Sequence, residues 1–197
     1  MSAILERDSR AKALIFDLDG TLIDNMPIHY RAWQRVAEEK GFEYPEELFY
    51  ELAGIPTIKI VPLMNERLGI NLEPEETTAL KEKYFLEMIG EIPLIEETVS
   101  IVRTCHGKIP MSVGTGSRKE IAEKVLAATG LYNYFEIVIT ADDVANHKPA
   151  PDTFLRCAEA MGVEPRNCQV FEDGEQGLAA ARSAGMIATD VRPFLKK

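Results

Sequence analysis

Two aspartates with a spacing of two, Asp17 and Asp19, come directly after the apolar run at 13–16. Carboxylates this close repel each other unless a positive charge lies opposite them. Gly20 allows the chain to turn tightly, so that both side chains can face one crevice although successive strand residues point to opposite sides. One carboxylate could then attack a phosphorus atom while the other gives and takes a proton, which is nucleophilic catalysis with general acid and base assistance.

Further polar groups follow later apolar runs. "VGTGS" at 113–117 offers Thr115, "HKPAPD" at 147–152 contains Lys148, and "FEDGEQG" at 171–177 supplies Glu172 and Asp173. Ligands bind at the carboxyl ends of parallel strands, so we expect these residues to meet Asp17 in one crevice. A Mg²⁺ ion would relieve the repulsion among the carboxylates, because it prefers oxygen ligands and keeps waters for a phosphate.

An alternation of strands and helices must position these side chains. The sequence predicts buried strands at 13–16, 110–113, 136–139, 169–171 and 187–191. Helical patterns, each followed by a glycine, lie between the later strands at 118–129, 151–161 and 175–184. The predicted fold class is therefore α/β, with a Rossmann-like parallel sheet covered on both faces.

Almost a hundred residues separate the first predicted strand from the second, which is too many for a loop. This segment has helical patterns of its own at 27–40, 45–52, 56–68 and 74–89, and a helix at 95–105 returns the chain to the sheet. We predict a core domain of residues 1–22 and 91–197 and an inserted helical cap domain of residues 23–90. Hinges near 22–26 and 90–94 would close the cap over a small substrate.

The composition restricts the partners. The chain has 197 residues, of which 46% are hydrophobic, and 22 basic against 32 acidic residues give a net charge of −10. We expect no nucleic acid partner, because an acidic surface repels polyanions. The apolar runs are too short to span a bilayer and the N-terminus lacks a signal-peptide pattern, so we expect a cytoplasmic protein with no membrane partner. We also expect a monomer whose three cysteines are free thiols.

Four motifs in order, "DLDGT", "VGTGS", "KPAPD" and "FEDGEQGLAAARSAGM", resemble those of the haloacid dehalogenase superfamily over essentially the whole chain. The helical insert after "DLDGT" resembles the cap of the β-phosphoglucomutase-like branch. "HYRAW", "PMSVGTGS" and "HKPAPDTFLRCAEAMGV" are similar to the fructose-1-phosphate phosphatase-like group. The resemblance implies a Mg²⁺-dependent phosphoric monoester hydrolase that acts on a small sugar phosphate, with fructose 1-phosphate favoured.

The resemblance also assigns roles to individual residues. Asp17 would be the nucleophile, Asp19 the general acid and base, Thr115 a ligand of the phosphoryl group and Lys148 a neutralising cation. Mg²⁺ would be held by Asp17, the backbone carbonyl of Asp19, Glu172 and Asp173. The candidate substrate-binding residues are His29, Gly54, Thr57, Lys59, Gly116 and Ser117.

Two alternatives remain open. A β-phosphoglucomutase would convert β-glucose 1-phosphate to glucose 6-phosphate through a bisphosphate, and its cap needs a grip for the second phosphate. Thr57 stands where that family shows an arginine, which favours a phosphatase. The more remote alternative is a catalytically silent binding module. Within the predicted cap, we interpret Asp24 as the N-terminal capping residue of the first helix and Trp33 as core packing.

Overall fold

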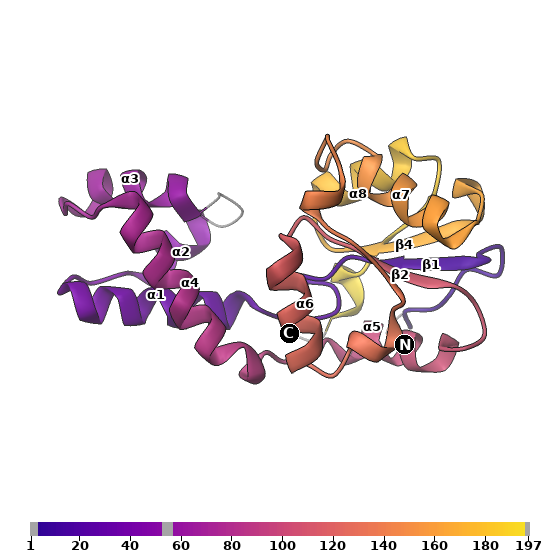
Figure 1. Cartoon of the computed structure of the whole chain (residues 1–197), viewed down its shortest axis with the longest axis horizontal. Helices are drawn as coiled ribbons and strands as arrows, with labels where there is room; N and C mark the ends of the chain where they lie inside the picture. The colour runs from indigo at the N-terminus through magenta and orange to yellow at the C-terminus, as the bar shows by residue number, and fades with distance from the viewer. Residues whose placement is uncertain (1–3, 53–56, 196–197) are drawn as a thin grey trace. The chain divides into compact units, whose positions relative to one another are not determined.

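The computed structural model describes residues 4–52 and 57–195 (Figure 1). The chain divides into two compact units. One comprises Met1–Asp24 and Pro93–Lys197, and the other comprises Asn25–Ile92. We call them the core unit and the helical unit.

The core unit contains a five-stranded sheet in the order β3-β2-β1-β4-β5, in which every pairing is parallel. The strands are β1 Ala13–Phe16, β2 Met111–Gly114, β3 Ile137–Ile139, β4 Cys168–Glu172 and β5 Ile187–Asp190. The predicted α/β fold class is confirmed. Because β1 pairs with both β2 and β4, the residues that follow these three strands are neighbours at one edge of the sheet.

Helices cover both faces of this sheet (Figure 1). Helices α5 and α6 lie on one face, and α7 and α8 lie on the other. Their bounds are α5 Glu96–Cys105, α6 Lys119–Ala128, α7 Asp152–Met161 and α8 Glu175–Ser183. Short 3₁₀ helices lie in the connections at η2 Tyr132–Tyr134, η3 Ala141–Asp143 and η4 Pro165–Asn167, and a further one, η5 Arg192–Phe194, follows β5.

The core of this unit follows the alternation of side chains along the central strands. Ala13 and Ile15 of β1 belong to the cluster that includes Phe154 of α7 and Ala180 of α8. The next residue, Phe16, points to the opposite side of the strand and stacks on Phe171 of β4, with ring centroids 4.8 Å apart. Both faces of β1 are therefore buried, which is why its sequence is continuously apolar.

The helical unit contains α1 Met26–Lys40, α2 Glu46–Glu51, α3 Thr57–Leu68, α4 Pro74–Met88 and the 3₁₀ helix η1 Ile89–Glu91. Trp33 is 2% exposed, which confirms its prediction as core packing. The interpretation of Asp24 as a cap was wrong. Helix α1 begins one residue earlier than predicted, so Asn25 takes the capping position, and Asp24 is exposed.

Two other expectations concern the whole chain. The three cysteines are free thiols, and two of them are buried. Over residues 4–52 and 57–195, none of the helices combines the length and the apolar character that crossing a lipid bilayer requires.

Candidate active site

The turn after β1 brings the first motif against the fourth. The backbone N–H of Asp17 donates to the carbonyl of Phe171 at 3.0 Å, which fixes the end of β1 beside the end of β4. Gly20 has a φ of +84°, and a Cβ added to it would lie 2.6 Å from Cγ of Asp173. Only glycine suits this position, because the turn needs a left-handed backbone and Asp173 occupies the space of a side chain.

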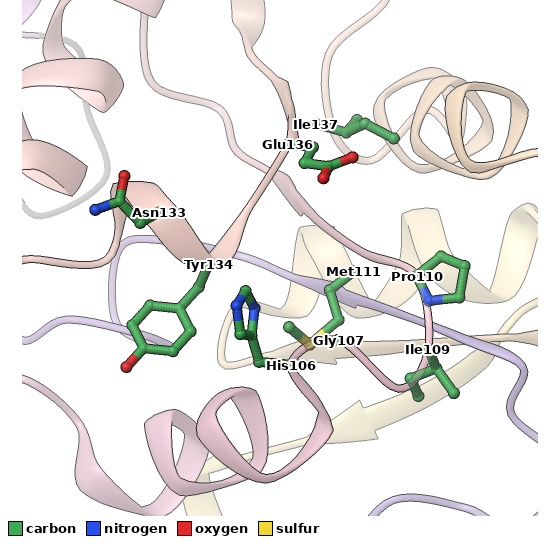
Figure 2. A pocket seen from close by; sticks show the side chains of 9 residues that line it. All are labelled: His106, Gly107, Ile109, Pro110, Met111, Asn133, Tyr134, Glu136 and Ile137. Atoms are coloured by element: carbon green, nitrogen blue, oxygen red, sulfur yellow. The ribbon is translucent and has the colours of Figure 1, made fainter.

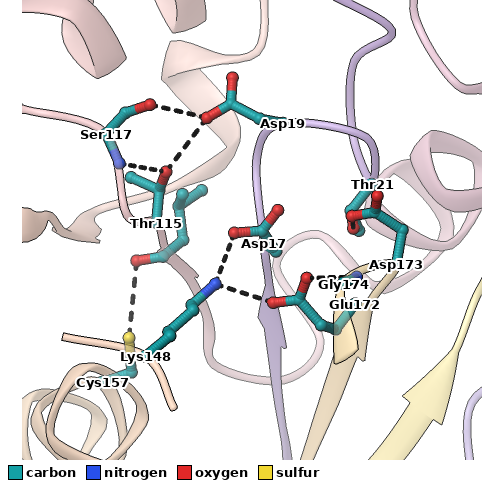
Figure 3. Close-up of polar contacts among 11 residues, drawn as sticks. Asp17, Asp19, Thr21, Thr115, Ser117, Lys148, Cys157, Glu172, Asp173 and Gly174 are labelled. Atoms are coloured by element: carbon teal, nitrogen blue, oxygen red, sulfur yellow. Dashed lines mark hydrogen bonds and ion pairs between the residues drawn. The ribbon is translucent and has the colours of Figure 1, made fainter. Parts of the chain in front are cut away.

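An acidic cluster forms where β1 and β4 end. One carboxylate oxygen from each of Asp17, Glu172 and Asp173 lies within 4.8 Å of the others. Nζ of Lys148 donates to Oδ1 of Asp17 at 2.6 Å and to Oε2 of Glu172 at 2.8 Å (Figure 3). The hydroxyl of Thr21 donates to Oδ1 of Asp173 at 3.1 Å. The structure thus brings together four predicted site residues from three separate motifs: Asp17, Lys148, Glu172 and Asp173.

Burial and mutual repulsion set the charges of this cluster. Burial, and then the charge of Asp17, raise the pKa of Glu172 to about 7 and also raise the pKa of Asp173. Burial opposes the charged form of Lys148, but the carboxylates of Asp17 and Glu172 outweigh it and raise the pKa of this ammonium above its usual value. Lys148 is therefore a permanent cation at neutral pH, whereas its carboxylate partners carry more negative charge than it balances.

The donor set fits a divalent metal ion. Three carboxylates with closely spaced oxygens repel one another and are stabilised when a hard cation neutralises them. Oxygen donors with no nitrogen or sulfur ligand suit Mg²⁺. The residues present could therefore hold such an ion.

Asp19 lies in a second set of contacts, on the side of β2. Its Oδ2 accepts from the hydroxyl of Ser117 at 2.7 Å and from the hydroxyl of Thr115 at 3.4 Å (Figure 3). The backbone N–H of Ser117 donates to Oγ1 of Thr115 at 3.0 Å. Burial, and then the charge of Asp17, raise the pKa of Asp19 to about 6, although these hydroxyls act against the shift. A carboxyl with this pKa can both donate and accept a proton near neutral pH.

Residues 11–185 match the haloacid dehalogenase-like hydrolase family. The chain belongs to this family. It is an enzyme of the phosphoric monoester hydrolase class.

Among the relatives of this hydrolase is the fructose-1-phosphate phosphatase YqaB of Escherichia coli, which is 44% identical over 93% of this chain and 97% of its own. A phosphorylated carbohydrates phosphatase of Thermotoga maritima is 34% identical over 89% of this chain and 82% of its own. The crystal structure of a β-phosphoglucomutase from Clostridium difficile has a TM-score of 0.70 and 27% identity, and the match covers 91% of this chain and 84% of that one. The family that the four motifs predicted is confirmed.

Among the candidate substrate-binding residues of the helical unit, His29 has contacts through both ring nitrogens and its ring face. Nδ1 of His29 lies 2.8 Å from Nζ of Lys81, and its Nε2 lies 3.3 Å from the amide nitrogen of Asn25. Its ring stacks on Phe85 with centroids 4.2 Å apart. Burial, and then Lys81, lower the pKa of His29 to about 3. Because an ammonium can only donate, Nδ1 of the neutral His29 ring accepts from Lys81.

The remaining candidates are placed as follows. Thr57 begins α3, Lys59 is exposed on the same helix, and Gly54 lies outside the described residues. Gly116 is exposed beside Ser117 in the core unit. The part of these residues in substrate binding stays a prediction.

Two side-chain contacts of the hydrolase were not predicted. Thr21 was passed over although it is the last residue of "DLDGT", and a hydroxyl at this point was the available signal. Lys81 is buried in α4, at 6% exposure, and no sequence pattern indicated its contact with His29, 52 positions earlier.

A separate cavity of about 210 Å³ lies at the amino ends of β2 and β3 (Figure 2). The ring of His106 meets that of Tyr134 edge to face there, with centroids 5.0 Å apart. The active-site residues follow the carboxyl ends of the strands, so this cavity lies at the other edge of the sheet. Its lining consists of His106, Gly107, Ile109, Pro110, Met111, Asn133, Tyr134, Glu136 and Ile137.

Proposed function

We propose that this hydrolase releases phosphate from a small sugar phosphate through a phosphoryl-aspartate intermediate on Asp17, with fructose 1-phosphate as the favoured substrate. The observation that carries the proposal is the pairing of Asp17 with the ammonium of Lys148 in a buried acidic cluster. A buried carboxylate held by a lysine is oriented for attack on phosphorus. The choice of substrate is supported by the 44% identity to the Escherichia coli fructose-1-phosphate phosphatase.

In the first half of the reaction, an oxygen of Asp17 forms a bond to phosphorus while the bond from phosphorus to the sugar oxygen breaks. Asp19 gives its proton to the departing sugar oxygen, a role that its pKa of about 6 suits. The hydroxyl of Thr115 donates to a phosphoryl oxygen, and Lys148 balances negative charge between Asp17 and the phosphate.

In the second half, Asp19 takes a proton from a water molecule, whose oxygen forms the new bond to phosphorus. The bond between phosphorus and Asp17 breaks, so that inorganic phosphate leaves and both aspartates return to their starting states. The same carboxyl thus acts first as an acid and then as a base.

Mg²⁺ is the proposed cofactor, with Asp17, Glu172, Asp173 and the backbone carbonyl of Asp19 as its ligands. When bound, the ion supplies positive charge that stabilises the charge developing on the transferred phosphoryl group. The close spacing of the three carboxylates supports this assignment.

We further propose that the helical unit selects the leaving group, through His29, Gly54, Thr57 and Lys59. Thr57 stands where the mutase-like relatives are expected to carry an arginine for a second phosphate. A threonine there favours release of the sugar to water over its return as a bisphosphate.

The test is a panel of fructose 1-phosphate, 2-deoxyglucose 6-phosphate and β-glucose 1-phosphate, assayed for free phosphate with Mg²⁺ and with EDTA. We expect Mg²⁺-dependent phosphate release, fastest with fructose 1-phosphate, and its loss in Asp17→Asn. Full turnover by Asp17→Asn on every substrate would overturn the covalent proposal.

The same panel separates the mutase alternative. If β-glucose 1-phosphate with a bisphosphate primer yields glucose 6-phosphate rapidly while free phosphate stays low, the enzyme is a mutase. If the intact protein turns over none of the substrates with Mg²⁺ present, the proposed substrate class is wrong.

A further inference from the structure

The ammonium of Lys148 has an aromatic neighbour in addition to its two carboxylates. Its Nζ lies 4.7 Å from the centroid of the Phe154 ring. Phe154 is fully buried in α7, and the side chain of Lys148 is 12% exposed. A cation over a ring face is attracted by the negative face of the ring, and the attraction is largest where water is excluded. Because both side chains are largely shielded from water, the attraction between the Lys148 ammonium and the Phe154 ring is stronger here than at an exposed site.

The end of β2 leaves the space that the ring needs. A Cβ added to Gly114 would lie 3.1 Å from Cδ1 of Phe154 and 3.0 Å from Sγ of Cys157. Both contacts are tighter than ordinary packing, so a side chain at this position would push the ring away. The position of the Phe154 ring thus explains why a glycine precedes Thr115 in "VGTGS".

A ring face suits this task better than another acid would. Lysine has a flexible stem of four carbons, so two hydrogen bonds alone leave its ammonium room to move. A further carboxylate would hold the ammonium but would add to the repulsion among Asp17, Glu172 and Asp173. An aromatic ring attracts the cation and carries no net charge.

We propose that Phe154 is a positioning residue, whose ring face holds the Lys148 ammonium between Asp17 and Glu172, and that Gly114 keeps open the space into which the ring fits. The inference rests on the proposed function in one respect, the role of Lys148. The positioning itself is a property of the metal-free protein and can be measured without a substrate.

The first test replaces Phe154 with phenylalanines that carry one, two and three ring fluorines. Fluorine weakens the negative ring face stepwise and changes the shape of the side chain little. We expect kcat for phosphate release to fall stepwise, about tenfold across the series, with a smaller change in KM. Phe154→Leu, which keeps an apolar side chain but has no ring, should fall at least as far. A merely structural role for Phe154 predicts a flat series.

The second test uses urea unfolding in EDTA, with no substrate. In the protein that keeps Lys148, the trifluorinated ring should lower the urea midpoint of unfolding. In the Lys148→Met background, where no cation faces the ring, the same ring should lower the midpoint less. Equal changes of the unfolding midpoint in both backgrounds would overturn the inference. It would also be overturned if Lys148→Met abolishes activity while kcat stays the same across the fluorinated rings. Failure of the proposed function looks different, because Asp17→Asn and Lys148→Met would then both retain turnover.

Discussion

Replacing Glu172 with glutamine should change how the stability of the metal-free protein depends on pH. Burial, and then the charge of Asp17, raise the pKa of Glu172 from 4.5 to about 7. Glu172 therefore contributes stability that is fully present below pH 4.5 and is lost as the pH rises through about 7. Glutamine has a similar shape and stays neutral, so Glu172→Gln avoids this loss.

The difference between 4.5 and about 7 corresponds to about 3 kcal/mol, at about 1.36 kcal/mol for each unit of pKa. The assay is urea denaturation in EDTA at pH 5 and at pH 8. Relative to the unmodified protein, Glu172→Gln should gain about 2–3 kcal/mol of unfolding free energy between these pH values. The titration of His29, which burial and Lys81 shift and Glu172 does not, is common to both proteins and cancels in the comparison.

A matched control is Glu38→Gln, because Glu38 is exposed on α1. This change should leave the difference from the unmodified protein nearly constant with pH. Adding Mg²⁺ at pH 8 should stabilise the unmodified protein more than Glu172→Gln, which lacks one carboxylate of the cluster. Parallel stability curves for Glu172→Gln and the unmodified protein would refute the electrostatic account of the cluster.

Three further predictions follow from the same geometry. Lys148→Met should lower kcat about 100-fold or more and destabilise the metal-free fold by about 3–5 kcal/mol, because two buried carboxylates lose their ammonium; unchanged phosphate release would contradict this. Gly20→Ala should weaken the activation of the enzyme by Mg²⁺. The control Gly41→Ala has a similar φ of +75° and no atom within 4 Å of its added Cβ, so it should carry only the backbone cost of about 1–2 kcal/mol. Equal Mg²⁺ activation constants for the two variants would count against the role of the turn. His29 should stay neutral from pH 8 to pH 5 in NMR titrations, because burial and a nearby lysine lower its pKa to about 3; a midpoint near 6.5 would be the wrong result.

The sheet could be predicted because each strand contains a short apolar run. The one-residue shift of β2 has a physical cause. Pro110 has no N–H, so it cannot join the ladder as a donor, although its carbonyl accepts from Leu14 at 3.0 Å. Gly114 has no apolar side chain to mark it, yet it pairs with Ile139. Backbone pairing thus extends past the hydrophobic signal.

The acids of the site could be predicted because parallel strands gather their carboxyl ends. The contacts that tune these acids could not. The bond from Ser117 to Asp19 joins residues 98 positions apart, and it depends on the side-chain conformation of each. Lys81 is charged and was expected on no buried face, yet α4 turns it toward His29. Helical periodicity fixes neither the rotation of one helix against another nor the partner of a buried charge.

The central claim is that Asp17 becomes phosphorylated, and a direct measurement is to trap that state. The protein would be mixed with fructose 1-phosphate and Mg²⁺, quenched in acid within one turnover, treated with borohydride and digested for mass spectrometry. Borohydride reduces a phosphorylated aspartate to homoserine and leaves a free carboxylate intact. The account predicts homoserine at position 17 only when substrate and Mg²⁺ are both present, and less of it in Asp19→Asn, which lacks the acid that the first half of the reaction requires. Rapid phosphate release with an unmodified Asp17 at every quench time would contradict it.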